Sequence, residues 1–131
     1  MKISSKALRL YAVTDRSWLK ENQTLTDSVE KAILGGVTIV QLREKNTDFE
    51  EQLSLAQELK TVCKKYNVPL IINDSVELAL KSGADGIHLG QSDGDIKKAR
   101  EILGDNAIIG ATAHNVNEAV SAFKSGADYL G

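Results

Sequence analysis

The stretch KSGADGIHLGQSD, residues 81–93, places the end of a helical pattern, a buried strand and a polar loop in direct succession. Gly83 stands where a residue free to adopt positive φ closes a last helical turn. The apolar run at Gly86–Leu89 is typical of a strand, and the polar loop after it ends in Asp93. The pentapeptide KSGAD recurs at 124–128. The repeat therefore marks a structural unit that the chain uses more than once.

Strand and helix signals alternate along the rest of the chain. Several strand candidates are nearly continuous apolar runs, as strands covered on both faces are. The expected strands are Leu8–Thr14, Val37–Arg43, Pro69–Asn73, Gly86–Leu89, Ala107–Gly110 and Asp128–Leu130. Between them, apolar residues recur at three- and four-residue spacing, which indicates helices with one face toward a sheet. Cys63 falls on such a stripe and is expected to be a core residue.

The boundaries of the expected helices carry repeated signals. A short polar residue followed three positions later by Glu resembles a capping box. Four such pairs are Asp27/Glu30, Asp48/Glu51, Asp74/Glu77 and Asn115/Glu118. The glycines predicted to close last turns with positive φ are Gly35, Gly83, Gly104 and Gly126. The last three are spaced 21 and 22 residues apart, which indicates a regular β-α unit.

Strands that alternate with helices predict a parallel sheet with right-handed crossovers. The usual outcomes are an open doubly wound sheet and a closed TIM-type (β/α)8 barrel. A dinucleotide-binding sheet normally has a glycine-rich turn after its first strand, and YAVTDRSW at 11–18 has none, which favours the barrel. A full barrel needs eight units and roughly 200 residues or more, and this chain supplies about five and a half units. We therefore expect residues 1–131 to form a single, incomplete α/β-barrel domain, with exposed sheet edges that favour self-association.

Composition narrows the classes of partner. Apolar residues make up 42% and charged residues 26% of the chain, the formal net charge is −2 and the two signs are interleaved, so no basic face for nucleic acid stands out. The longest apolar run is far shorter than the ~18 residues of a membrane span, and the N-terminus lacks the apolar core of a signal peptide. We expect no nucleic-acid partner, no membrane partner and a cytoplasmic location.

Cationic residues follow the second expected strand, at the end where α/β barrels carry their chemistry. Alternation places Gln41, Arg43 and Lys45 on one face of the strand. A guanidinium and an ammonium at a strand end suit a phosphate or pyrophosphate group. The alternative is a solvated loop in which the cations pair with Glu44 and Asp48.

Two acids, Asp74 and Asp93, follow neighbouring strands and could converge on one site. Hard oxygen ligands from separate loops, completed by water and phosphate oxygens, describe a typical Mg²⁺ site. Alternatively, Asp74 caps a helix and Asp93 is a turn residue. Their position beside Arg43 and Lys45 favours the metal site, because a metal that bridges a pyrophosphate needs cationic neighbours for the remaining charge.

The two histidines lead to different expectations. His88 lies inside a buried-strand pattern, so we expect a hydrogen-bonded residue of the barrel interior rather than a general base. His114 belongs either to the rim of the pocket or to the start of the next helix. No histidine or cysteine cluster has the spacing of a zinc site.

Six blocks of the sequence resemble the thiamine-phosphate synthase family. They are LYAVTD, GVTIVQLREK, IINDSVELAL, GADGIHLGQSD, IGATAHN and GADYLG, in this order and spacing, between Leu10 and Gly131. The resemblance implies an α/β-barrel transferase that joins hydroxymethylpyrimidine diphosphate to thiazole phosphate, giving thiamine phosphate and pyrophosphate. It also implies a dissociative mechanism, in which Mg²⁺ and the cations stabilise the departing pyrophosphate and the thiazole nitrogen traps a pyrimidine-stabilised carbocation.

The resemblance also implies a role for each site residue. Arg43 and Lys45 would act on the phosphates as the catalytic pair, and Asp74 and Asp93 would bind Mg²⁺. Thr112 would lie beside the pyrimidine, where the family usually has a serine. The residues implied to bind substrate are Gln41, Leu42, Arg43, Glu44, Lys45, Asn73 and Thr112.

The family continues past GADYLG into loops that contact the pyrophosphate and the thiazole phosphate. We therefore expect an N-terminal portion with about half of the site, and activity in the complete barrel rather than in this piece. Two alternatives stay open. One is a non-catalytic half-barrel that binds phosphate ligands or associates with itself. The other is a relative of the thiazole tautomerases, similar barrels that lack the metal-binding acids; the presence of Asp74 and Asp93 favours the synthase.

Overall fold

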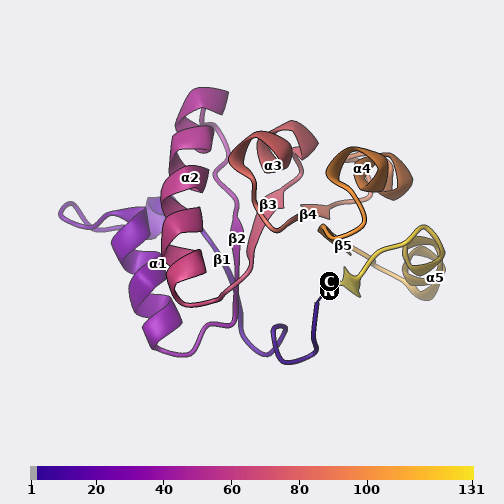
Figure 1. Ribbon diagram of the computed structural model, residues 1–131, viewed down its shortest axis with the longest axis horizontal. Helices are drawn as coiled ribbons and strands as arrows, with labels where there is room; N and C mark the ends of the chain where they lie inside the picture. Colours follow the sequence, from indigo (N-terminus) through magenta and orange to yellow (C-terminus); the bar gives the residue numbers. More distant parts are fainter. Residues whose placement is uncertain (1–2) are drawn as a thin grey trace.

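The computed structural model describes residues 3–131, in which a curved parallel sheet is covered by helices along its outer side (Figure 1). The strands are β1 (Tyr11–Val13), β2 (Ile39–Leu42), β3 (Leu70–Asn73), β4 (Gly86–Leu89), β5 (Ile108–Ala111) and β6 (Tyr129–Leu130). The helices are the 3-10 helix η1 (Arg16–Trp18), α1 (Leu25–Leu34), α2 (Phe49–Lys65), α3 (Val76–Ser82), α4 (Ile96–Leu103) and α5 (Val116–Lys124). Within the described residues, no helix has both the length and the apolar character needed to cross a membrane.

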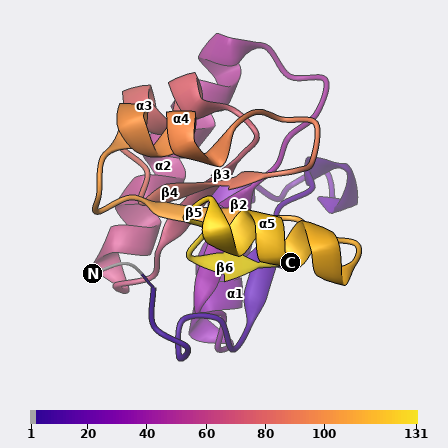
Figure 2. The same cartoon turned by 90° about the vertical axis from the view of Figure 1, so that its right-hand side faces the viewer.

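The strands pair in chain order from β1 to β6, and every pairing is parallel. Because the order never reverses, the sheet is part of an α/β barrel and not a doubly wound sheet. In the described part of the chain β1 and β6 are the two edges, and β6 with α5 faces the viewer in Figure 2. The predicted fold, a partial (β/α)8 barrel, is thus confirmed as a six-stranded half-barrel.

The six predicted strands all form. β4 has the predicted bounds, and β5 begins and ends one residue later than predicted. β1 begins later than the predicted Leu8–Thr14, because the backbone N–H groups of Leu8 and Arg9 form turn bonds, to the carbonyls of Ser5 at 3.2 Å and Lys6 at 3.3 Å.

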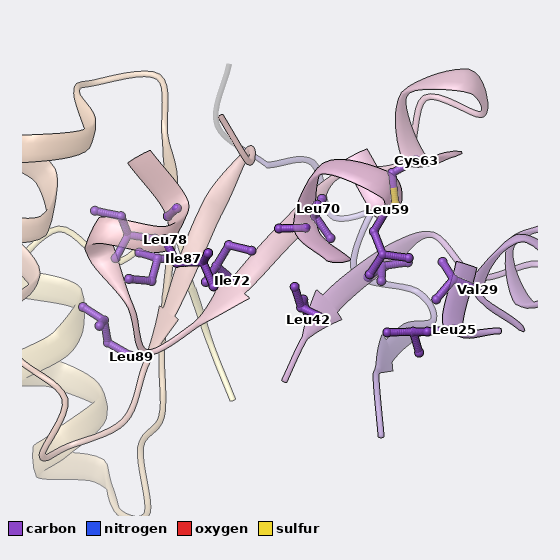
Figure 3. Close-up of a cluster of buried hydrophobic side chains, with 14 of the residues drawn as sticks. Leu25, Val29, Leu42, Leu59, Cys63, Leu70, Ile72, Leu78, Ile87 and Leu89 are labelled. Atoms are coloured by element: carbon purple, nitrogen blue, oxygen red, sulfur yellow. The ribbon is translucent and has the colours of Figure 1, made fainter. Parts of the chain in front are cut away.

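Strand alternation separates two layers of buried side chains. The outer layer fills the space between strands and helices (Figure 3), and its labelled members are Leu25, Val29, Leu42, Leu59, Cys63, Leu70, Ile72, Leu78, Ile87 and Leu89. The inner layer consists of Ile39, Ile71, Ile108 and Tyr129. Full burial of a leucine or isoleucine side chain contributes about 1.5–3 kcal/mol. The outer layer therefore holds the helices to the sheet, and the inner face is left to carry polar groups.

Two of the predicted helix starts are confirmed, because Asp48 caps α2 and Asn115 caps α5, each accepting a hydrogen bond from the backbone N–H three residues later. The predicted start of α1 at Asp27 is wrong. Thr24 is the cap, and its hydroxyl accepts from the Asp27 N–H at 3.1 Å. The earlier start brings Leu25 into the helix, where its side chain joins the buried layer.

The predicted cap of α3 at Asp74 is also wrong, and this correction matters for the site. Ser75 is the cap, and its hydroxyl accepts from the backbone N–H of Leu78 at 3.1 Å. Asp74 itself has a φ of 66°, a left-handed conformation that few residues other than glycine adopt. The carboxyl group of Asp74 is therefore not needed to start the helix.

Positive φ at helix ends is confirmed for Gly83, Gly104 and Gly126, at 66°, 91° and 101°. It is wrong for Gly35, which has a φ of −80° and stays helical. The next residue, Gly36, takes the positive value of 117°, and β2 begins at Ile39, two residues later than the predicted Val37.

Both copies of KSGAD lie at the starts of strands and tie neighbouring strands together through their aspartates. The Asp85 carboxylate accepts from the backbone N–H of Leu70 at 2.8 Å, and the Asp128 carboxylate accepts from that of Ile109 at 2.8 Å. Arg100 of α4 also donates to Asp128 at 2.8 Å. The repeat is therefore a structural device at the N-terminal ends of the strands, opposite the end where α/β barrels carry chemistry.

Cys63 is a core residue, as predicted. Its side chain lies on α2 in the outer layer and is 1% exposed. Burial, with the negative charge of Asp85, raises the pKa of the thiol to about 12. Since the thiolate is the reactive form, Cys63 is chemically inert in the folded chain.

Candidate functional site

The C-terminal ends of β2 to β5 bring polar side chains together. They form one edge of the sheet, made of strand ends and distinct from the side strands β1 and β6. Gln41 and Asn73 lie on the inner face, and Asn73 is the register partner of His88 on β4. Thr112 follows β5, and its hydroxyl forms a hydrogen bond with Nε2 of His88 at 2.9 Å. The other ring nitrogen of His88 bonds to the hydroxyl of Tyr129 at 3.0 Å, so His88 is a hydrogen-bonded interior residue as predicted.

Asp74 and Asp93 bring their carboxyl groups together at this edge. Asp93 is fixed in its loop because Oδ2 accepts from the backbone N–H of Gly90 at 2.8 Å. Burial, a hydrogen bond with Asp93 and the charge of Asp93 raise the pKa of Asp74 to about 6, against the opposing effects of Asn73 and Lys45. Two carboxyl groups in such contact require either a shared proton or a cation between them.

The carboxyl pair fits a hard divalent cation. The acids come from separate loops, and the left-handed backbone of Asp74 frees its carboxyl group from helix capping. Across residues 3–131, no group of three or more His, Cys, Asp or Glu side chains gathers that could hold a metal ion. A cation bound by this pair would take its other ligands from water and phosphate oxygens, the arrangement that Mg²⁺ favours.

The two cations of the QLREK stretch lie toward different neighbours. The charge of Lys45 lowers the pKa of Asp74, which places its ammonium within electrostatic range of the acid pair. The pKa of Asp15 is lowered first by hydrogen bonds within its own turn and further by the charge of Arg43, so Arg43 lies toward the loop after β1. The backbone N–H of Arg43 is held by the hydroxyl of Thr14 at 2.9 Å. Lys45 is thus the cation of this stretch whose charge acts on the acid pair, whereas the charge of Arg43 acts on Asp15.

Two predicted substrate-binding residues turn their side chains away from this edge. Leu42 is 2% exposed and belongs to the outer apolar layer. Glu44 is 8% exposed, and its carboxylate accepts from the backbone N–H of Arg16 at 2.7 Å and pairs with the Arg16 guanidinium at 3.2 Å. The substrate contacts that the resemblance implies for Leu42 and Glu44 therefore stay a prediction, and the burial of both side chains restricts such contacts to backbone atoms.

Arg16 is a supporting residue that the sequence does not single out. Besides Glu44, its guanidinium bonds to Glu51 at 2.8 Å and to Thr47 at 3.0 Å. These bonds join η1 to the loop after β2 and to the first turn of α2. The position of Glu44 between Arg43 and Lys45 was the sequence signal for such a residue. A buried carboxylate needs a cationic partner, and Arg16 is that partner.

His114 belongs to the start of α5 and not to the rim of the site. The Glu118 carboxylate accepts from both the backbone N–H and the ring Nδ1 of His114, at 2.6 and 3.0 Å. The two alternatives left open by the sequence are thereby resolved in favour of a helix-start residue.

A hollow of about 950 Å³ lies at the opposite end of the strands. Lys60, Gly83 and Asp85 are among the residues that line it, and Asp85 is committed to a backbone N–H of β3. The candidate site is therefore identified by its converging polar groups and not by a cavity.

Known proteins share both the sequence and the fold. Residues 10–131 match the sequence family described as thiamine monophosphate synthase. A thiamine-phosphate synthase of Clostridium novyi is 53% identical over 123 residues, which are 94% of this chain and 60% of the relative. The same-named protein of Clostridium acetobutylicum is 51% identical over 123 residues, or 94% and 58% of the two chains. The chain thus spans about 60% of the length of these relatives.

Two solved structures have a similar fold. Thiamine phosphate pyrophosphorylase from Pyrococcus furiosus superposes with a TM-score of 0.88 at 39% identity, over 96% of this chain and 60% of that one. An aldolase from Escherichia coli K12, at 13% identity and a TM-score of 0.65 over 82% of this chain and 48% of its own, shares the fold alone.

Proposed function

Because the chain belongs to the thiamine monophosphate synthase family, we propose that it carries the diphosphate- and metal-binding half of a transferase site in thiamine biosynthesis. The reaction of the whole protein would join hydroxymethylpyrimidine diphosphate to thiazole phosphate. The C–O bond between the pyrimidine methylene and the pyrophosphate breaks, and its electron pair leaves with pyrophosphate. The lone pair of the thiazole nitrogen then forms the new C–N bond. Residues 1–131 would be one incomplete domain of that protein.

The contact between Asp74 and Asp93 within range of Lys45 is the observation that supports the proposal most. The two carboxylates would hold Mg²⁺, which when bound neutralises charge on the pyrophosphate oxygens. Lys45 and Arg43 stabilise the same developing charge from the protein side, the ammonium as a point charge and the guanidinium as a bidentate donor. Substitution by departure of a charged group requires this stabilisation more than it requires a general base.

The inner-face residues position the pyrimidine. Gln41, Asn73 and Thr112 present amide and hydroxyl groups from three different strand ends. Asn73 also forms a hydrogen bond with the Asp74 carboxyl group, which orients that acid beside the substrate. Such positioning lowers the barrier by holding the reacting atoms in line.

Calorimetric titration of the chain with pyrophosphate, with and without MgCl₂, tests this proposal. We expect binding that needs Mg²⁺, and we expect Lys45→Ala to weaken it by about tenfold, because a charge-assisted bond is lost. Lys65→Ala is the matched control, since Lys65 pairs with Glu30 on the outer surface at 3.1 Å. Binding that ignores Mg²⁺, or an equal effect of the two variants, would contradict the proposal.

A second candidate function, self-association of the half-barrel, is favoured by exposed apolar surface. Val116, Val120 and Phe123 line up along α5 and are 77%, 45% and 74% exposed. In the described sheet β1 and β6 also have one strand neighbour each, and unpaired strand edges promote association. We expect light scattering to give a mass above the 14.2 kDa of one chain, rising with concentration. A constant mass of one chain up to high concentration would exclude it.

A further inference from the structure

A continuous chain of hydrogen bonds crosses the inner face from β2 to the loop after β5. Gln41 Nε2 donates to the hydroxyl of Tyr11 at 2.9 Å, and the hydroxyls of Tyr11 and Tyr129 lie 2.5 Å apart. The Tyr129 hydroxyl bonds to Nδ1 of His88 at 3.0 Å, and Nε2 of His88 bonds to the hydroxyl of Thr112 at 2.9 Å. The two ends of this hydrogen-bond chain, Gln41 and Thr112, are two of the three residues proposed to position the pyrimidine.

We infer that every hydrogen bond of this series is donated in the same direction, from Gln41 toward Thr112. Tyr11, Tyr129 and His88 then act as positioning residues for the two residues at its ends. The inference rests on the proposed function for what the ends contact. The direction itself follows from the groups that make the chain.

The direction starts at Gln41, because the Nε2 group of an amide can only donate. The Tyr11 hydroxyl accepts that bond, and its own hydrogen is directed to the Tyr129 oxygen. Tyr129 then donates its hydrogen to Nδ1 of His88. The imidazole is therefore neutral with its proton on Nε2, and it donates to Thr112. This order lets every hydroxyl accept one bond and donate one bond.

The surroundings of His88 and the tyrosines agree with a neutral chain. Burial lowers the pKa of His88, which favours the uncharged imidazole. Burial is also the main cause that raises the pKa of Tyr11 and of Tyr129, so both keep their hydrogens. Tyr129 is 8% exposed and fits because Gly110 has no side chain; a Cβ there would lie 2.1 Å from the tyrosine ring.

The consequence concerns what each end offers to a ligand. Thr112 accepts from His88, so its own hydroxyl hydrogen is free to donate. Gln41 uses its NH₂ group on Tyr11, so its carbonyl oxygen remains as an acceptor. An aminopyrimidine carries the complementary pair, an exocyclic amine that donates and ring nitrogens that accept. The hydrogen-bond chain thus makes its two ends complementary to an amino-substituted ring.

Nitrogen-15 NMR of the histidine rings tests the direction without any ligand. We expect His88 to carry its proton on Nε2 in the wild-type protein at neutral pH. We expect this preference to be lost in Tyr129→Phe, which removes only the hydroxyl at the centre of the hydrogen-bond series. His114 serves as an internal control in each sample. Tyr66→Phe is the matched control variant, because its hydroxyl bonds to Glu30 at 2.6 Å on the outer side. A proton on Nδ1 in the wild type, or an unchanged ring in Tyr129→Phe, would overturn the inference.

Ligand binding separates this inference from the proposed function. We expect Tyr129→Phe to weaken hydroxymethylpyrimidine diphosphate by about fivefold, the effect of one lost hydrogen bond, and to leave pyrophosphate affinity within about twofold. Equal weakening of both ligands would overturn the positioning role. If the wild-type protein bound neither ligand, the proposed function would fail. The NMR result would still decide the direction in which the hydrogen bonds are donated.

Discussion

Gly86→Ala is expected to destabilise the chain by about 3 kcal/mol or more, the upper end of what overpacking costs. Gly86 begins β4, and a Cβ at this position would lie 1.9 Å from the carbonyl oxygen and 2.7 Å from the carbonyl carbon of Ile108. These are backbone atoms of the neighbouring strand, so no rotamer change relieves the contact. The added methyl group would therefore push β4 and β5 apart at their start.

Urea unfolding followed by far-UV circular dichroism measures this effect. Gly35→Ala is the control, because Gly35 has an ordinary helical φ of −80° and its nearest contacts to a new Cβ, at 3.4 Å and beyond, are normal. We expect the control to stay within about 0.5 kcal/mol of the wild type, as most surface changes do. A Gly86→Ala chain that lost less than about 1 kcal/mol would show that the two strands can separate without cost.

The strands could be predicted from the sequence because their apolar runs are continuous. The run LII at the start of β3 is an example, and β4, in which His88 interrupts the apolar residues, still has the predicted bounds Gly86–Leu89. Helix starts were harder, because several short polar residues compete for each cap. Ser75 follows Asp74 directly, and either could cap α3 by side-chain chemistry alone. The positive φ of Asp74 decides between them, and that angle is a property of the folded loop.

The candidate site was predictable where it depends on strand ends, and not where it depends on the curvature of the sheet. The meeting of Asp74 with Asp93 follows from adjacent parallel strands. The bond between Tyr11 and Tyr129 does not, because it joins β1 to β6, which are not neighbours in the sheet. The sheet must curve before these hydroxyls meet, and no local pattern in the sequence reports that curvature.

Asp74→Asn is expected to weaken Mg²⁺-dependent pyrophosphate binding by at least about tenfold while the fold is kept. The substitution removes one of the two carboxylates proposed to hold the metal. Asparagine tolerates the left-handed backbone that Asp74 adopts, so no strain is added. Calorimetry of the variant and the wild type, each with pyrophosphate and MgCl₂, measures the change.

The same substitution has a pH-dependent effect on stability in the absence of metal. The pKa of Asp74 lies at about 6 in the folded chain, above its ordinary value of 3.8. Folding therefore favours the protonated form, and the stability that this proton provides is lost as the pH rises through 6. Asparagine carries no charge at any pH. Near pH 4, about the usual aspartate pKa, Asp74→Asn should thus have the same unfolding free energy as the wild type. At pH 7 it should unfold at a higher urea concentration than the wild type.

Ser75→Ala separates a role in metal binding from a role in starting α3. Loss of the Ser75 cap should cost about 1 kcal/mol of unfolding free energy and leave pyrophosphate affinity within about twofold.

Asparagine is itself a good cap, so a purely capping Asp74 would tolerate Asp74→Asn with neither a binding defect nor a gain in stability at pH 7. The metal-site proposal requires opposite signs in the two measurements, weaker binding together with higher metal-free stability. A variant that bound Mg²⁺ and pyrophosphate as the wild type does would remove Asp74 from the proposed site, whatever its stability.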